Sequence, residues 1–120
     1  MSTAPRVLIT GAVGYIGRQL ATTLAERVST GEFGAVVGTD IREWDASSRP
    51  AALEWVTRDV REPGLEAVLR AHAVDVVVHL AAIVTPEPHS TRDFEYSVDV
   101  GGTRAVLDAC IAAGVRRIVV

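Results

Sequence analysis

Three glycines near the start of the chain have the spacing of a phosphate-binding turn. Gly11, Gly14 and Gly17 form the pattern G-x-x-G-x-x-G directly after the apolar run Val7–Ile9. A glycine turn between a strand and a helix directs backbone N–H groups and the positive end of the helix dipole at a bound pyrophosphate. We assign Gly11 to the tight turn, Gly14 to the close approach of the phosphates and Gly17 to helix–strand packing. An ordinary strand–helix turn is the alternative, but it does not account for this spacing.

A carboxylate closes the second apolar run, Ala35–Asp40. Asp40 follows Gly17 at about the 20-residue offset of the acid that accepts hydrogen bonds from the adenosine ribose. A carboxylate there accepts from the 2′-OH of NAD and repels the 2′-phosphate of NADP, so NAD is the favoured cofactor. Arg42 would weaken that preference. A solvated aspartate at a strand end is the alternative.

Two further apolar runs end in polar residues. Asp59 and Val60 follow the third run, where a carboxylate could accept from an adenine amino group while valine packs on the ring. The spacing equally allows Asp59 to be a turn residue before Pro63. His79 closes the fourth run, and a histidine inside a buried strand is more often a hydrogen-bonded core residue than a catalytic base.

The pattern of apolar runs predicts alternating strands and helices. The expected strands are Arg6–Thr10, Ala35–Asp40, Leu53–Thr57, Val74–Leu80 and Val115–Val120. The expected helices are Tyr15–Val28, Pro63–Ala73 and Ser90–Ala113, the last with Gly114 as its C-cap. This order predicts a single α/β domain over residues 1–120. Its sheet is doubly wound and parallel, with strand order 3-2-1-4-5, and ends after the fifth strand.

Two helices have features that predict their packing. Ile16, Leu20, Leu24 and Val28 recur every four residues and predict the inner face of the first helix. Gly101–Gly102 interrupts the long helix, where each glycine costs about 1 kcal/mol. The glycine pair therefore indicates a close approach, either to the cofactor or within the core alone.

Composition excludes several classes of protein. The formal net charge is −3, which makes a nucleic-acid partner unexpected. One cysteine and three scattered histidines predict neither a disulfide framework nor a metal site. No apolar run approaches the roughly 20 residues that span a bilayer, and the segment Met1–Arg6 is too short and polar for a signal peptide. We expect a cytoplasmic protein that does not bind membranes.

Together these segments resemble the extended short-chain dehydrogenase/reductase family, in its NAD-dependent epimerase/dehydratase branch. The matching segments are Val7–Gly17, Asp40, Asp59–Arg61, Val77–Ala82, Val100–Thr103 and Gly114–Val119. The resemblance implies a pyrophosphate site at Gly11, Tyr15, Ile16 and Gly17. It also implies a ribose contact at Asp40, an adenine site at Asp59 and Val60, and a nicotinamide side at Leu80, Ala81 and Ala82.

The chain departs from the family pattern at two points. Asp99 stands where the family usually has asparagine, and a carboxylate there accepts hydrogen bonds but cannot donate them. The family's catalytic Tyr-x-x-x-Lys is missing, because the sequence contains no lysine. We therefore assign no catalytic residue and expect the 120 residues alone to be inactive. We also expect them to be the N-terminal part of a longer protein.

Three functions are compatible with these residues. The leading hypothesis is the NAD-binding part of an epimerase, dehydratase or reductase that acts on a nucleotide sugar by hydride transfer. A non-catalytic dinucleotide sensor of the same fold is the second. A methyltransferase is the third. The usual glycine pattern of methyltransferases is tighter than G-x-x-G-x-x-G, however, and the segment His79–Ala82 has no role in them. The apolar run Val115–Val120 would form an exposed sheet edge, which predicts pairing with another copy of the chain.

Overall fold

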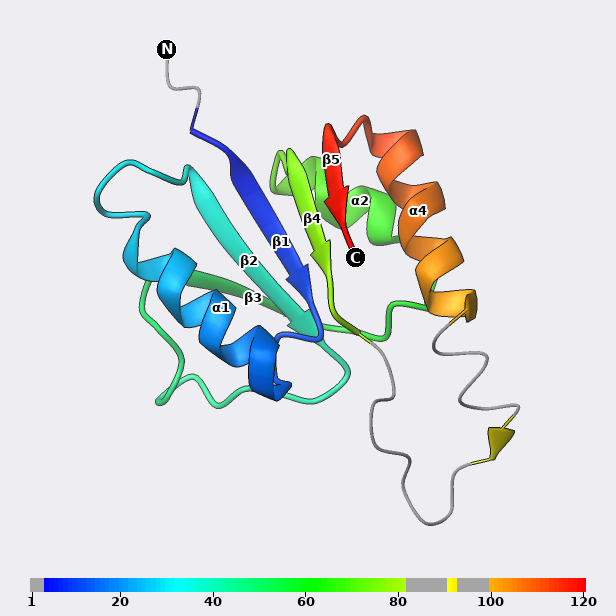
Figure 1. Cartoon of the computed structure of the whole chain (residues 1–120), viewed down its shortest axis with the longest axis horizontal. Coiled ribbons are helices and arrows are strands. Elements are labelled where there is room, and N and C mark those ends of the chain that lie inside the picture. Colours follow the sequence, from blue (N-terminus) through cyan, green and yellow to red (C-terminus); the bar gives the residue numbers. More distant parts are fainter. Residues whose placement is uncertain (1–3, 82–90, 93–99) are drawn as a thin grey trace.

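The computed structural model describes residues 4–81, 91–92 and 100–120, which form one five-stranded sheet (Figure 1). Every neighbouring pair of strands is parallel, and the order is β3-β2-β1-β4-β5. The strands are β1 (Arg6–Thr10), β2 (Ala35–Asp40), β3 (Leu53–Thr57), β4 (Val76–His79) and β5 (Arg117–Val119). The predicted α/β class and strand order are confirmed.

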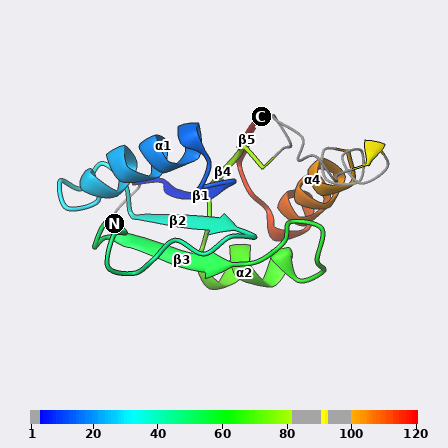
Figure 2. The ribbon, with the colours of Figure 1, turned by 90° about the horizontal axis from the view of Figure 1, so that it is seen from below.

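In the described part of the chain, three helices cover the two faces of the sheet. They are α1 (Tyr15–Glu26), α2 (Leu65–Ala71) and α4 (Gly102–Ala113). Figure 2 shows α1 and α2 on opposite sides of the strands. Among the described residues, no helix is long and apolar enough to cross a membrane.

Alternate residues of β1 to β4 enter two separate cores. On one face Leu8 and Val77 pack with Val106 of α4. On the other face Ile9 packs with Ala21 of α1. Because both faces are covered, the central strands β1, β2 and β4 each carry an uninterrupted apolar run, as is typical of parallel sheets.

The inner face of α1 differs from the predicted one. Small residues line it, and Gly17, Ala21 and Ala25 are its buried positions. Ile16, predicted to face inward, is 67% exposed. The larger apolar side chains flank this face and are partly buried: Leu20, Leu24 and Val28. The prediction is therefore wrong at Ile16, whereas the other three side chains pack against the core beside the buried glycine and alanines.

Several elements are shorter than predicted. The first helix ends at Glu26 rather than Val28, the second covers Leu65–Ala71 rather than Pro63–Ala73, and β4 and β5 each lose residues at both ends. At α2 the helix is stopped by Ala73, whose φ of 50° is left-handed. Gly114, with φ of 75°, is confirmed as the C-cap of the last helix. Part of the predicted helix Ser90–Ala113 lies outside the described residues.

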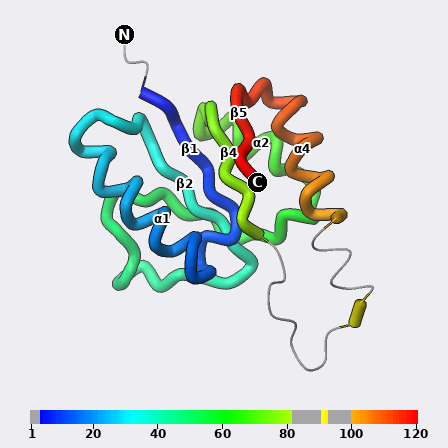
Figure 3. Tube along the Cα trace, viewed as in Figure 1, coloured from blue at the N-terminus to red at the C-terminus, as the bar shows by residue number. Residues whose placement is uncertain are grey.

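The carboxyl ends of the strands meet at one edge of the sheet, as the tube in Figure 3 shows. The turn after β1, the end of β2 and the end of β4 come together there, since β1 pairs with both β2 and β4. Ligands of doubly wound sheets bind in the crevice outside these ends, where the winding reverses. The sequence therefore folds so that its candidate residues share one edge.

Candidate cofactor-binding site

The glycine turn rests directly on the end of β4. Gly11 has a φ of 69°, and a Cβ added to it would lie 2.7 Å from both the Ala81 nitrogen and the Leu80 carbonyl carbon. Glycine is the only amino acid that adopts this left-handed backbone without strain and places no Cβ against the end of β4. Gly11 thus joins the first turn of the site to the Leu80–Ala81 backbone.

The other two glycines differ in what surrounds them. A Cβ on Gly17 would overlap the Gly11 carbonyl oxygen and lie 2.9 Å from the Ala12 Cα. Among the described residues, a Cβ on Gly14 would meet only the Gly11 carbonyl oxygen, at 3.3 Å. Packing therefore requires glycine at position 17, whereas at position 14 the missing side chain leaves space above the turn.

That space lies at the N-terminus of α1. No side chain caps the helix at Gly14, and helix geometry leaves the first N–H groups without a carbonyl partner in the helix. Tyr15 and Ile16, in the first turn, are 84% and 67% exposed. Unpaired N–H groups, the helix dipole and an open backbone fit a bound pyrophosphate.

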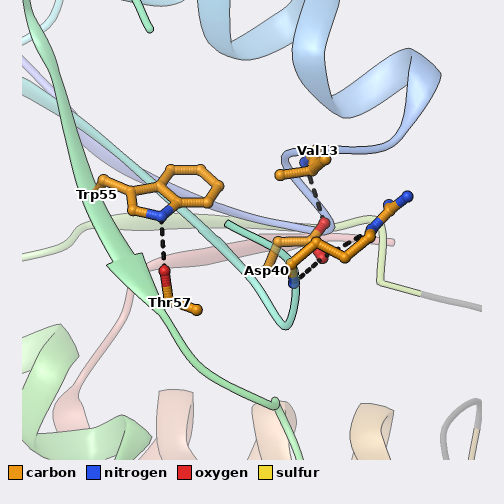
Figure 4. Close-up of polar contacts among 5 residues, drawn as sticks. Val13, Asp40, Trp55 and Thr57 are labelled. Carbon is orange, nitrogen blue, oxygen red and sulfur yellow. Dashed lines mark hydrogen bonds and ion pairs between the residues drawn. The ribbon is translucent and has the colours of Figure 1, made fainter. Parts of the chain in front are cut away.

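Asp40 bridges the glycine turn and the end of β2 (Figure 4). Its Oδ2 accepts a hydrogen bond from the Val13 N–H at 3.0 Å. Its Oδ1 accepts from the Arg42 backbone N–H at 3.0 Å and lies 3.4 Å from the Arg42 Nε. The residue is only 7% exposed. Because an ionised carboxylate has about four acceptor positions, it retains capacity for a ribose hydroxyl.

An aromatic cluster that sequence reasoning missed fixes the segment after Asp40. Trp44 is 4% exposed, with the Arg18 guanidinium 4.6 Å from the centre of its ring. The ring of Trp55 meets it edge-on at 5.9 Å, and the Trp55 Nε1–H donates to the Thr57 Oγ1 at 2.9 Å (Figure 4). In the sequence, Trp44 is a large apolar residue within a polar stretch, and this was the only feature that could have predicted its burial.

The carboxylate of Asp59 is occupied by a neighbouring arginine. The Arg61 guanidinium donates to Asp59 Oδ2 at 2.6 Å and its backbone N–H donates to Oδ1 at 2.8 Å. This hydrogen bonding holds the pKa of Asp59 below its usual range. Val60 is 5% exposed, and a Cβ on Gly102 would lie 2.9 Å from it, which identifies one close approach of the glycine pair. The adenine contacts of Asp59 and Val60 stay predictions.

His79 lies inside a polar chain rather than in an open site. It is 5% exposed, with its Nδ1 2.7 Å from the Thr10 Oγ1 and its Nε2 3.1 Å from the Thr103 Oγ1. Burial lowers the pKa of His79. The interpretation of His79 as a hydrogen-bonded core residue is confirmed.

The structure brings together most of the predicted site residues that it describes. Gly11, Leu80 and Ala81 are in contact, and Asp40 reaches the same turn through Val13. Ala82 and Asp99 lie outside the described residues. Within residues 4–81, 91–92 and 100–120, no group of three histidine, cysteine or acidic side chains is placed to hold a metal.

Comparison with known proteins assigns the family. The model of the NAD dependent epimerase/dehydratase family matches residues 7–120. The chain belongs to this family. The resemblance drawn from the sequence motifs is thereby confirmed, and so is the type of cofactor associated with the family.

The relatives of this chain include sugar epimerases and dehydrogenases as well as 3-beta-hydroxysteroid dehydrogenases. UDP-glucose 4-epimerase of Azospirillum brasilense is 33% identical over 97% of this chain and 33% of its own length. L-arabinose 1-dehydrogenase (NAD(P)(+)) of Haloferax volcanii is 35% identical over 95% of this chain and 39% of its own length. Among solved structures, MoeE5 in complex with UDP-glucuronic acid and NAD is 32% identical with a TM-score of 0.72, covering 94% of this chain and 35% of that one. The chain thus spans about a third of these relatives.

Proposed function

We propose that residues 1–120 form a dinucleotide-binding domain that binds NAD across the carboxyl edge of the sheet. The observation that supports this most directly is the uncapped N-terminus of α1 beside Asp40. The N–H groups of Tyr15, Ile16 and Gly17 would hold the pyrophosphate. The family membership and the NAD bound to MoeE5 support the same cofactor.

Asp40 would select NAD over NADP. Its carboxylate would accept from the ribose 2′-OH and repel a 2′-phosphate. The Arg42 side chain contacts the same carboxylate and is 62% exposed. Its positive charge would favour the 2′-phosphate of NADP instead. We propose NAD as the preferred cofactor, with NADP bound less tightly. Asp59, Val60, Leu80, Ala81, Ala82 and Asp99 complete the proposed cofactor contacts.

The reaction we propose is hydride transfer on a nucleotide sugar. Bound NAD supplies a hydride acceptor. The residues of this chain bind and orient the dinucleotide, and the sequence offers no Tyr-x-x-x-Lys for acid–base chemistry. The UDP-sugar names of the Azospirillum relative and of MoeE5 support the substrate class. We propose that these 120 residues bind NAD without turnover, in the cytoplasm.

The test is a cofactor titration of the purified chain. A ligand that binds only the folded state stabilises it by RT ln(1 + [L]/Kd), so NAD should raise the melting temperature more than NADP does. S-adenosylmethionine should leave it unchanged. Calorimetric titration then gives the dissociation constants.

A matched pair of variants locates the site. Gly14→Val places a side chain over the turn, in the space proposed for the phosphates, and should abolish the NAD-dependent shift. Gly101→Ala is the control, because a Cβ there meets no described residue within 4 Å. Stabilisation by S-adenosylmethionine but not by NAD would refute the proposal, and so would an unchanged NAD shift in Gly14→Val.

A further inference from the structure

Thr10, His79 and Thr103 form a buried chain of side chains that joins three elements. Thr10 ends β1, His79 ends β4, and Thr103 lies in the first turn of α4. The two links are the Thr10 Oγ1–His79 Nδ1 contact of 2.7 Å and the His79 Nε2–Thr103 Oγ1 contact of 3.1 Å. Thr10 is fully buried and His79 is 5% exposed. The dinucleotide contacts proposed above do not use these three side chains.

The surroundings of Thr10 determine where the histidine proton lies. The Thr10 Oγ1 accepts hydrogen bonds from the Leu80 N–H at 3.0 Å and the Ala81 N–H at 3.1 Å. The Leu80 N–H is shared with the Thr10 carbonyl oxygen at 3.2 Å. A hydroxyl has two acceptor positions and one donor. With both acceptor positions in use, Thr10 donates its proton to the His79 Nδ1.

The Nδ1 atom of His79 is therefore an unprotonated acceptor. The proton of a neutral imidazole then lies on Nε2, from where it is donated to Thr103. An imidazolium would direct a second N–H at the Thr10 oxygen, which has no acceptor position left. Geometry alone thus specifies the neutral Nε2–H form.

The chain of contacts ends at the backbone that supports the glycine turn. Leu80 and Ala81 are held by Thr10, and a Cβ on Gly11 would lie 2.7 Å from the Ala81 nitrogen. Gly11 therefore has no room to move toward β4, and any shift of Leu80–Ala81 would shift the turn. The position of the turn decides where the N–H groups of α1 are directed.

We propose that Thr10, His79 and Thr103 are positioning residues of the cofactor site, with His79 held as the neutral Nε2–H tautomer. Through this tautomer they connect α4 to the Leu80–Ala81 backbone and so fix the Gly11 turn. The inference rests on the proposed function for its effect on NAD. The tautomer and the backbone protection are independent of that function.

The first measurement is the ¹⁵N spectrum of His79 in the intact chain at neutral pH. It should show an unprotonated Nδ1 and a protonated Nε2. Thr103→Val removes the acceptor of the Nε2 proton, so the Nε2 resonance should shift while Nδ1 stays unprotonated, because Thr10 still donates to it. A protonated Nδ1 in the wild-type chain would overturn the proposal, whether or not the chain binds NAD.

The second measurement combines amide exchange with NAD titration in Thr10→Val and Thr10→Ser. Valine keeps the shape but accepts no hydrogen bond through its side chain, so the Ala81 amide should exchange about tenfold faster, and the Kd for NAD should rise about tenfold. The Leu80 N–H keeps the Thr10 carbonyl oxygen as its acceptor and should change less. Serine keeps the hydroxyl and should restore both values. If Thr10→Val does not fold, Thr103→Val and Thr10→Ser still test the chain of contacts.

The outcomes separate the two proposals. Slow amide exchange and the Nε2–H tautomer without NAD binding would refute the proposed function and leave the positioning chain intact. NAD binding with unchanged exchange and affinity in Thr10→Val would refute the positioning role and leave the cofactor function intact.

Discussion

The Asp40 carboxylate accepts a hydrogen bond from the backbone N–H of Val13, with 3.0 Å between Oδ2 and the nitrogen. The acid proposed to bind the ribose therefore also fixes the turn proposed to bind the phosphates (Figure 4). A change at Asp40 should consequently affect both parts of the site. Both hydrogen bonds are partly buried, so loss of either also leaves a partly buried N–H group without its acceptor.

Asp40→Asn tests this coupling. An amide presents one oxygen, so either the Val13 or the Arg42 N–H loses its acceptor. We expect the NAD Kd to rise about tenfold and the free energy of unfolding to fall by about 1–3 kcal/mol. Calorimetric titration and urea unfolding measure the two effects. Asp45→Asn is the control, since Asp45 accepts from the Ser47 N–H in an exposed turn. Lower stability with unchanged NAD affinity would limit Asp40 to a structural role.

Gly17→Ala should destabilise the fold. The added methyl group would overlap the Gly11 carbonyl oxygen, which is backbone and cannot rotate away. Overpacking of this kind costs about 1–3 kcal/mol, so the urea midpoint should drop by a corresponding amount. Gly101→Ala should leave the midpoint unchanged or raise it, because within the part of the chain that the structure describes a Cβ there meets nothing within 4 Å. Equal midpoints for the two variants would contradict the packing argument.

The strands were predictable because their residues are apolar and their turns are rich in glycine. The bounds of Arg6–Thr10, Ala35–Asp40 and Leu53–Thr57 are those predicted. A parallel sheet covered on both faces imposes continuous apolar runs, and these are visible in one sequence. The order of the strands followed from the glycine turn, which marks the first strand of a doubly wound fold.

What the sequence did not reveal depends on distances between elements. The face of α1 was misassigned at Ile16, since periodicity does not report how closely a helix approaches a sheet. The burial of Trp44 depends on Arg18 and Trp55, which are remote in sequence. Likewise, Asp59 was predicted without its partner Arg61, although the two residues are neighbours.

Arg42→Ala should increase the preference for NAD. The guanidinium lies 3.4 Å from Asp40 Oδ1 and its side chain is 62% exposed, so it would meet a 2′-phosphate at the solvent edge. An exposed charge pair of this kind changes affinity about two- to fivefold, and the NADP Kd should rise by that factor while the NAD Kd stays constant. Competition titrations give the ratio. Arg49→Ala serves as the control, because Arg49 packs over Trp55. An equal change in both constants would exclude a contact with the 2′-phosphate.

Stability should fall as the pH is lowered through the histidine range. Burial lowers the pKa of His79 in the folded state, so the unfolded chain takes up a proton first. The stabilisation is complete above the unfolded pKa of about 6.5 and is lost as the pH falls toward the folded pKa. The limiting slope is about 1.4 kcal/mol per pH unit.

His79→Asn isolates this contribution. Asparagine does not titrate, so urea midpoints measured from about pH 7.5 to about pH 5.5 should vary less than in the wild-type chain. The slopes are compared rather than the absolute values, because the substitution also removes the hydrogen bond to Thr103. Identical slopes would show that His79 takes up its proton equally in both states.

The outer edge of β5 is the last feature with a testable consequence. β5 ends the sheet, and Val119 and Val120 are 47% and 79% exposed. An exposed apolar edge strand pairs readily with another chain. We expect light scattering of this chain to show association that increases with concentration, and Val119→Lys to reduce it by placing a charge on the edge. Ile111→Lys, on the exposed side of α4, should leave association unchanged. If Ile111→Lys reduced association and Val119→Lys did not, the contact would lie on α4 rather than on β5. A chain that stays monomeric at every concentration would exclude both contacts.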